Sequence, residues 1–310
     1  MTVPRTVRWG VGLALVAACV SGLSIYLNGL YVKEFPDQTL LAAVRNSLVG
    51  LALVGMLVAG RRTTELRDLP ARRRLGLLAI GVVGGGIAFA LFFTGLALTT
   101  APGAALIQKT LFVWVALLAV VFLGERLGLA QILGMGALLA GTLLLTPGSL
   151  AAGPGEALIL VATLLWALEV LIAKRVLGEV RTLPAATARM VIGGLVLLGI
   201  VLFNGHLGQL AAWTPRQWTI VLGTGALLCG YVVAWYGALR RAPASVVTSV
   251  LVVGAVITSG LQAVTAGKLP DGARTGGLAL LAVGTILIVL AAAGWWRTHA
   301  ASTLARAADG

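Results

Sequence analysis

The chain has 310 residues, of which 59% are hydrophobic and only 11% are charged, and its net charge is +13. Soluble domains carry roughly a quarter charged residues, so this composition excludes a water-soluble globular protein. The basic residues lie in short connections between apolar stretches and not on one solvated face, which argues against nucleic-acid binding.

Long uncharged apolar windows recur along the chain. Each matches the roughly 20 residues that cross ~30 Å of hydrocarbon as a helix. Helices are required because lipid offers no partners to backbone amides. The sequence therefore predicts an all-α polytopic membrane protein with ten transmembrane helices. The expected spans are residues 9–30, 39–59, 76–98, 102–123, 129–147, 156–173, 184–204, 217–238, 244–266 and 275–294.

The basic residues between the spans predict the orientation of the protein. If the N-terminus is cytoplasmic, 16 of the 20 basic residues outside the spans lie on the cytoplasmic side, with the densest group in the 61–74 connection. Both termini are therefore expected in the cytoplasm. Arginine outnumbers lysine and Ala, Gly, Leu and Val dominate, which suggests a GC-rich bacterial genome and hence a bacterial inner (plasma) membrane.

Short motifs at the ends of spans recur about 143 residues later in the chain. In the first half they are Gly124-Glu125-Arg126-Leu127, Gly134 and Gly141-Thr142, and in the second half Gly267-Lys268-Leu269, Gly277 and Gly284-Thr285. Residues 1–150 and 151–310 are thus predicted to be five-helix repeats, the second ending in a short polar tail from about 297. Because five is odd, the repeats are expected to be inverted, as in many secondary transporters.

The repeated pattern resembles a known family. It comprises Arg45 in the second span, Gly95-Leu96-Ala97-Leu98 at the end of the third, Phe122 to Leu127 closing the fourth, and a fifth span punctuated by glycine. This pattern is similar to the EamA-type branch of the drug/metabolite transporter superfamily, over essentially the whole chain. The resemblance implies the architecture but not the substrate, since that family exports amino acids, sugars, nucleotide-related compounds and drugs.

Two positions depart from the family's pattern. The family usually carries a proline early in the fourth and ninth spans, where this sequence has Phe112 and, in the second half, Gly254 or Ala255. Glu125, which follows the fourth span, is replaced by Lys268 after the ninth. We therefore transfer the family's architecture to this chain, but not its coupling or gating residues.

Four ionisable residues fall inside predicted spans, where their cost makes them functional candidates. Glu169 and Arg189 are expected at similar depth and could form an ion pair; alternatively, Glu169 reaches toward the interface or only holds helices together. Arg45 and Lys109 are expected ~10 Å below the outer face by helical rise, with no acidic residue at matching depth. Backbone carbonyls, a water-filled cavity or a substrate carboxylate or phosphate could partner them.

The repeat predicts different roles for Arg45 and Lys109. Arg45 has a counterpart in Arg189, which favours a structural role common to both halves. Lys109, between Gln108 and Thr110, has no basic counterpart in the ninth span. Such asymmetry is typical of a ligand-specific residue, so we expect Lys109 to contact the substrate.

Aromatic residues also follow the repeat. Phe89 and Phe93 occupy positions equivalent to Tyr231 and Trp235, and each pair is four residues apart on one helix face. Trp166 precedes Glu169 by three residues. Such a stripe either packs the bundle or forms part of a binding surface. The predicted substrate-binding residues are Lys109, Gln108, Glu169, Trp166, Tyr231, Trp235, Phe89 and Phe93, with Arg45 and Arg189 as intramembrane charges.

The function expected from these features is secondary transport, by alternating access, that exports small organic metabolites such as amino acids or organic acids. An intramembrane enzyme acting on lipid or prenyl substrates is the alternative. It would need clustered acids, metal ligands or a nucleophile–base pair, and the sequence predicts none. No catalytic residue, metal or cofactor is therefore expected. The expected partners are a small-molecule substrate and membrane lipids, without nucleic acid, and a homodimer is left open.

Overall fold

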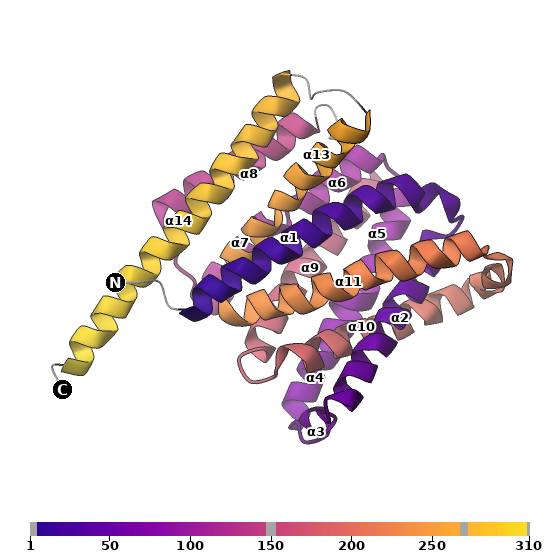
Figure 1. The fold of residues 1–310 in the computed structure, drawn as a ribbon, viewed down its shortest axis with the longest axis horizontal. Helices are drawn as coiled ribbons and strands as arrows, with labels where there is room; N and C mark the ends of the chain where they lie inside the picture. Colours follow the sequence, from indigo (N-terminus) through magenta and orange to yellow (C-terminus); the bar gives the residue numbers. More distant parts are fainter. Residues whose placement is uncertain (1–4, 147–152, 267–271, 309–310) are drawn as a thin grey trace.

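A computed structural model describes residues 5–146, 153–266 and 272–308 (Figure 1). Within these ranges the regular structure is helical, and 9 helices are long and apolar enough to cross a membrane. A further apolar helix, Leu129–Leu145, has 17 residues and so spans about 25 Å by helical rise. The expected arrangement of ten membrane-spanning helices in two repeats is confirmed.

The first repeat contains two spans that are not uniform α-helices. Its third span runs from α4 through a π-helical segment, η2, into α5, and its fourth span consists of α6 and α7. Its elements are α1 (Arg5–Tyr31), η1 (Val32–Glu34), α2 (Gln38–Ala59), α3 (Thr64–Arg67), α4 (Ala71–Ala79), η2 (Ile80–Ile87), α5 (Ala88–Ala97), α6 (Ala101–Lys109), α7 (Leu111–Leu123) and α8 (Leu129–Leu145).

The second repeat follows the same order, and α12 and α13 together form its fourth span. Its last helix continues well beyond the other helices toward the C-terminus (Figure 1). Its elements are α9 (Pro154–Val176), α10 (Thr182–Phe203), η3 (His206–Ala212), α11 (Pro215–Arg241), α12 (Ala244–Leu251), α13 (Val253–Ala266) and α14 (Gly272–Ala308).

Local sequence sets several helix ends. Asp37 caps α2, because its side chain accepts hydrogen bonds from the backbone N–H groups of Thr39 and Leu40. Thr214 and Gln217 form a capping box at the start of α11. Gly124 ends α7 with a φ of 67°, the left-handed conformation that glycine adopts without strain.

The packing of α8 against α14 shows that the repeats are inverted. Gly134 lies against Gly284, and Gly141 lies against Gly277. An added Cβ on Gly134 would lie 2.8 Å from the carbonyl oxygen of Gly284, and one on Gly141 would lie 2.7 Å from that of Gly277. The sequence numbers run in opposite directions along this contact, so the helices are antiparallel. Because Gly134 and Gly277 are repeat equivalents, as are Gly141 and Gly284, the two contacts exchange under a pseudo-two-fold axis.

The pair formed by α2 and α10 repeats this relation. An added Cβ on Gly50 would lie 3.1 Å from Val191 Cγ2, and one on Gly194 would lie 3.0 Å from Ser47 Oγ. A shift of 144 residues converts Ser47 to Val191 and Gly50 to Gly194. Small residues thus let the equivalent helices of the two halves approach each other closely.

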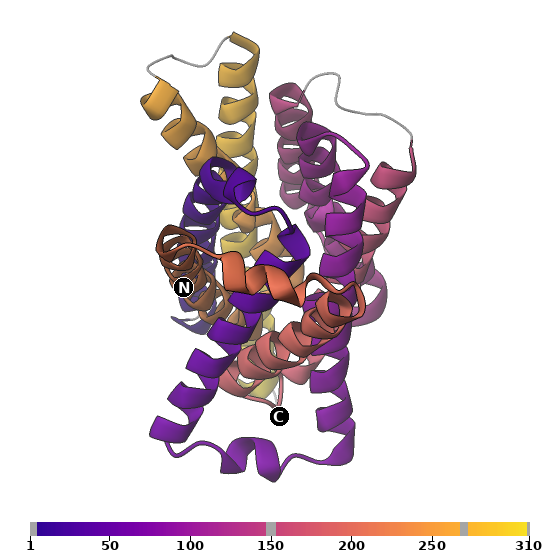
Figure 2. The same ribbon diagram turned by 90° about the vertical axis from the view of Figure 1, so that its right-hand side faces the viewer.

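Ion pairs join the two repeats at both ends of the bundle. We call the end that carries the 61–74 connection the basic end; Figure 2 shows its short helix α3 at the bottom of the molecule. At the basic end the pairs are Arg73–Glu179 and Glu65–Arg181. At the opposite end Glu34 pairs with Arg216, and the ring of His206 is hydrogen-bonded to Asp37. The connections therefore alternate between two ends, as the predicted spans require.

Candidate functional site

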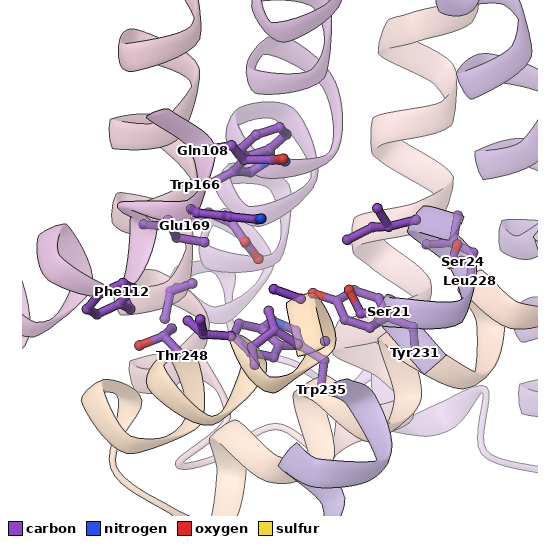
Figure 3. Close-up of a pocket in the computed structure, with 18 of the residues that line it drawn as sticks. Ser21, Ser24, Gln108, Phe112, Trp166, Glu169, Leu228, Tyr231, Trp235 and Thr248 are labelled. Atoms are coloured by element: carbon purple, nitrogen blue, oxygen red, sulfur yellow. The ribbon is translucent and has the colours of Figure 1, made fainter. Parts of the chain in front are cut away.

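A cavity of about 290 Å³ lies between the two repeats, and its lining comes from both of them (Figure 3). Its size is near the lower limit of small-molecule sites, about 300 Å³. The lining residues that carry polar groups are Ser21, Ser24, Gln108, Lys109, Trp166, Glu169, Arg189, Tyr231, Trp235 and Thr248. The rest of the wall is aliphatic or aromatic, so the cavity offers a few polar groups on an apolar surface.

The fourth span of each repeat is interrupted at the cavity. In the first repeat α6 ends at Lys109 and Thr110 makes a tight turn, with its N–H bonded to the carbonyl of Ile107 at 3.0 Å. In the second repeat the turn is at Val252, which is 143 residues after Lys109. Both Lys109 and Val252 line the cavity. Interrupted helices at the interface between inverted repeats are typical of substrate sites in secondary transporters.

Glu169 and Arg189 form an ion pair inside the bundle, with 3.5 Å between Oε1 and Nε. Both residues are buried and both line the cavity. Tyr236 on α11 also donates a hydrogen bond to Glu169 Oε1. The carboxylate therefore has a cationic and a neutral donor, which offsets much of the cost of placing it in the membrane.

The π-helical segment η2 supports this pair. The carbonyl of Gly84 accepts a hydrogen bond from Trp166 Nε1 at 3.0 Å and one from Arg189 Nη2 at 3.4 Å. An added Cβ on Gly84 would lie only 2.2 Å from Glu169 Cγ, so this position admits only glycine without rearrangement. The π-helical turn thus holds two cavity side chains in place, a use common to such turns at functional sites.

Lys109 differs from the other two charged residues of the cavity, Glu169 and Arg189. Within the part of the chain that the structure describes, its ammonium group has no hydrogen-bond or ion-pair partner. It follows Gln108, which also lines the cavity, and it closes the last turn of α6. A cation at the C-terminal end of a helix is favoured by the helix dipole. Since Glu169 and Arg189 neutralise each other, Lys109 leaves the cavity with one excess positive charge.

Aromatic rings form two opposing parts of the wall. Tyr231 and Trp235 stack with ring centroids 6.1 Å apart, whereas Phe89 meets Trp166 edge to face at 5.1 Å. The guanidinium of Arg189 lies over the Phe89 ring at 5.7 Å from its centroid. Figure 3 shows Trp166, Gln108 and Glu169 on one side and Tyr231 on the other.

The structure places most of the predicted site residues around one cavity. They are Phe89, Gln108, Lys109, Trp166, Glu169, Tyr231 and Trp235, together with the intramembrane charge Arg189. Phe93 is not part of the lining and packs against Phe89 and Phe92. Arg45 also lies outside the lining, and its Nη1 donates to Asn28 Oδ1 at 3.1 Å.

Sequence reasoning did not find four polar residues of the site. Ser21, Ser24 and Thr248 line the cavity, and Tyr236 lies behind it on Glu169. Tyr236 directly follows Trp235 but lies outside the four-residue aromatic spacing of Tyr231 and Trp235, so it was not predicted. The serines and Thr248 are uncharged, and the sequence carries no signal that marks them as cavity residues.

Comparison with known proteins assigns the chain to a family. Residues 8–146 and residues 153–290 each match the EamA-like transporter family. A solved structure titled only as the crystal structure of a protein matches with a TM-score of 0.74 at 20% identity, covering 90% of this chain and 97% of the other. At this identity the likeness concerns the fold. No curated protein matches the chain.

Proposed function

Since the chain belongs to the EamA-like transporter family, we propose that it is a secondary transporter that exports a small organic metabolite, such as an amino acid or another organic acid. The solute binds in the cavity between the inverted repeats. The observation that carries the proposal is the ammonium group of Lys109, which has no partner among the described residues and lies in a cavity whose ion pair, Glu169–Arg189, is internally neutralised.

The charges of the cavity favour an anionic solute. An ammonium group in a membrane interior is stabilised by an opposite charge, and a carboxylate that accepts its hydrogen bonds supplies one. Tyr231, Trp235 and Phe89 add aromatic surface for the apolar part of the same molecule. A cationic drug would instead meet the excess positive charge of Lys109.

The contacts between the interrupted spans support alternating access. Toward the basic end α7 packs against α12, whereas toward the opposite end α6 and α13 make no comparable contact among the described residues. The pseudo-two-fold axis makes these two pairs equivalent. The described conformation is therefore more tightly closed at the basic end, and exchange of the two contacts would close the other end.

The orientation follows from the charges. The basic end carries the arginines of the 61–74 connection, and we assign it to the cytoplasm by the positive-inside rule. Both termini then lie in the cytoplasm of a bacterial cell, and the cavity of this conformation faces away from it.

A transport screen in liposomes tests the proposal. Purified protein is assayed with amino acids, organic acids, nucleosides and cationic drugs, and protein-free liposomes are the control. We expect uptake of an anionic or zwitterionic solute, with a loss of at least about tenfold for Lys109→Ala, in the range of a lost charge-assisted hydrogen bond. Transport of cationic drugs alone, or unchanged transport by Lys109→Ala, would refute the charge assignment. Turnover of a lipid without translocation would support an enzyme instead.

A further inference from the structure

Arg45 on α2 is half-buried and has few partners for an arginine inside the membrane-spanning bundle. Its Nη1 donates to Asn28 Oδ1 at 3.1 Å, while its Nε is buried with no hydrogen-bond partner among the described residues. No described carboxylate pairs with it. A guanidinium inside a membrane is costly unless opposite charge or several acceptors satisfy it.

The other repeat has the partner that Arg45 lacks. Arg189, the repeat equivalent of Arg45, pairs with Glu169 at 3.5 Å and also donates to the carbonyl of Gly84. A shift of 144 residues places Ile25 at the position of Glu169, and Ile25 lines the cavity. A purely structural role common to both arginines would predict a counter-ion in both repeats, but among the described residues only Arg189 has one.

The cavity wall continues to Arg45 along two helices. On α1, Ser21 and Ser24 line the cavity, and Asn28 follows on the same face one turn later. On α11, Leu228 lines the cavity, and an added Cβ on Gly225 would lie 3.8 Å from Arg45 Cγ. Arg45 therefore lies about one helical turn, ~5 Å, beyond the cavity toward the end opposite the basic end.

We infer that Arg45 and Asn28 form a second binding station, which takes the carboxylate of the transported solute before it reaches, or after it leaves, Lys109. The planar guanidinium matches a carboxylate through two parallel hydrogen bonds, and its free Nε is one of the donors that such a bond uses. The serines of α1 supply hydroxyl groups between the two stations. This inference rests on the proposed function, because it assumes that an anionic solute occupies the cavity.

Three matched probes separate charge from shape. Phenylacetate, phenylacetamide and phenethylammonium share a ring but carry a negative, a neutral and a positive group. Their association and dissociation rates are measured by stopped-flow tryptophan fluorescence on the full-length protein, since Trp166 and Trp235 line the cavity. A station on the way to the cavity affects the association rate, whereas the final site affects the dissociation rate.

The decisive variant is Asn28→Asp, which gives Arg45 a carboxylate of its own. We expect the association rate of phenylacetate to fall about tenfold, with little change for phenylacetamide, because the arginine is already neutralised. The thermal midpoint should stay equal or rise, since the half-buried Arg45 gains a counter-ion. Asn28→Ser, which keeps a neutral acceptor and leaves the charge of Arg45 free, should slow phenylacetate association much less than Asn28→Asp does.

Two results would overturn the inference. One is an unchanged phenylacetate association rate in Asn28→Asp, which would make Arg45 structural. The other is an equal loss for phenylacetate and phenylacetamide, which would indicate damaged packing. Lys109→Gln, measured in parallel, reports on the cavity itself. If it accelerates phenylacetate dissociation while Asn28→Asp has no effect, the second station fails and the proposed substrate site stands; if neither variant has an effect, both fail.

Discussion

Glu169 lines the cavity and is also bound by Arg189 and Tyr236, so it belongs both to the binding surface and to the buried ion pair. The Glu169–Arg189 pair differs from an ordinary buried ion pair because a second cation, Lys109 of α6, lines the same cavity. Lys109 has no partner among the described residues. The electrostatics of the site therefore depend on which cation the carboxylate neutralises. With Arg189 neutralised, Lys109 remains available for a solute.

Removal of one member of the buried pair should cost more than removal of both. Glu169→Gln leaves Arg189 without its counter-ion, and we expect a loss of about 3 kcal/mol in stability. The double variant Glu169→Gln/Arg189→Gln should recover much of that loss, because no uncompensated charge remains. Thermal denaturation in detergent gives the comparison. Additive losses would show that the two side chains do not interact.

Gly84 is the glycine of η2 whose added Cβ would come closest to a neighbouring atom. Gly84→Ala should displace Glu169, since the new Cβ would lie 2.2 Å from its Cγ. We expect lower stability and a transport rate reduced by about tenfold or more, as misplacement of site groups by ~1 Å can cost a hundredfold. Gly230→Ala on α11 is the matched control, because nothing lies within 4 Å of its added Cβ. If both variants behave alike, close packing at Gly84 is not important.

At the scale of the elements, hydropathy predicted the spans because lipid requires about 20 apolar residues in helical form. It did not predict that η2 is π-helical or that the fourth spans turn at Thr110 and Val252. These features depend on how side chains of one helix fit against another, as Gly84 shows. Helices that are apolar on every side also carry little periodic signal about which face points inward.

The same limit explains which site residues could be predicted. Lys109 and Glu169 stood out because charge is costly in a membrane. Ser21 and Thr248 carry no such signal, since a hydroxyl can bond the preceding turn of its own helix, as Thr248 Oγ1 does with the carbonyl of Ala244 at 2.9 Å. Their place in the lining follows only from the packed structure.

The connection after α7 should stabilise the closed contact between α7 and α12 at the basic end, which we call the latch. Glu125 accepts hydrogen bonds from the backbone N–H groups of Ala244 at 2.7 Å and Ser245 at 3.2 Å, and so caps α12 across the repeats. Glu125→Gln should weaken this closure by about 1 kcal/mol, roughly a fivefold change in the open population. The readout is labelling of Thr248→Cys from the basic end, after Cys19 and Cys229 have been replaced.

The control for the latch is Glu65→Gln. Glu65 is half-buried and pairs at the same end with Arg181, whose side chain is exposed, and ion pairs with an exposed partner contribute little. Its labelling rate should match that of the parent. Equal acceleration by both substitutions would mean that any loss of charge at this end opens it, and the cap on α12 would have no special role.

At the scale of the whole molecule, the inverted repeats give the chain two equivalent ways to close. The contacts within α8–α14 and within α2–α10 obey the pseudo-two-fold symmetry. The interrupted spans do not obey it, because α7 packs against α12 while α6 and α13 make no comparable contact among the described residues. Because the two halves share a sequence pattern while their contacts differ, we expect a second conformation in which the contacts are exchanged. Transport through the cavity requires that both conformations be visited.

Alternating access through this cavity is tested most directly by measuring how fast a membrane-impermeant thiol reagent labels Gln108→Cys from each side of the membrane. The residue lines the cavity between the two closures. Without solute we expect labelling mainly from the end opposite the basic end. A transported solute should increase access from the basic end at the expense of the other. Access that stays restricted to one end with every solute that the screen identifies, or that occurs from both ends without exchange, would contradict alternating access through this cavity.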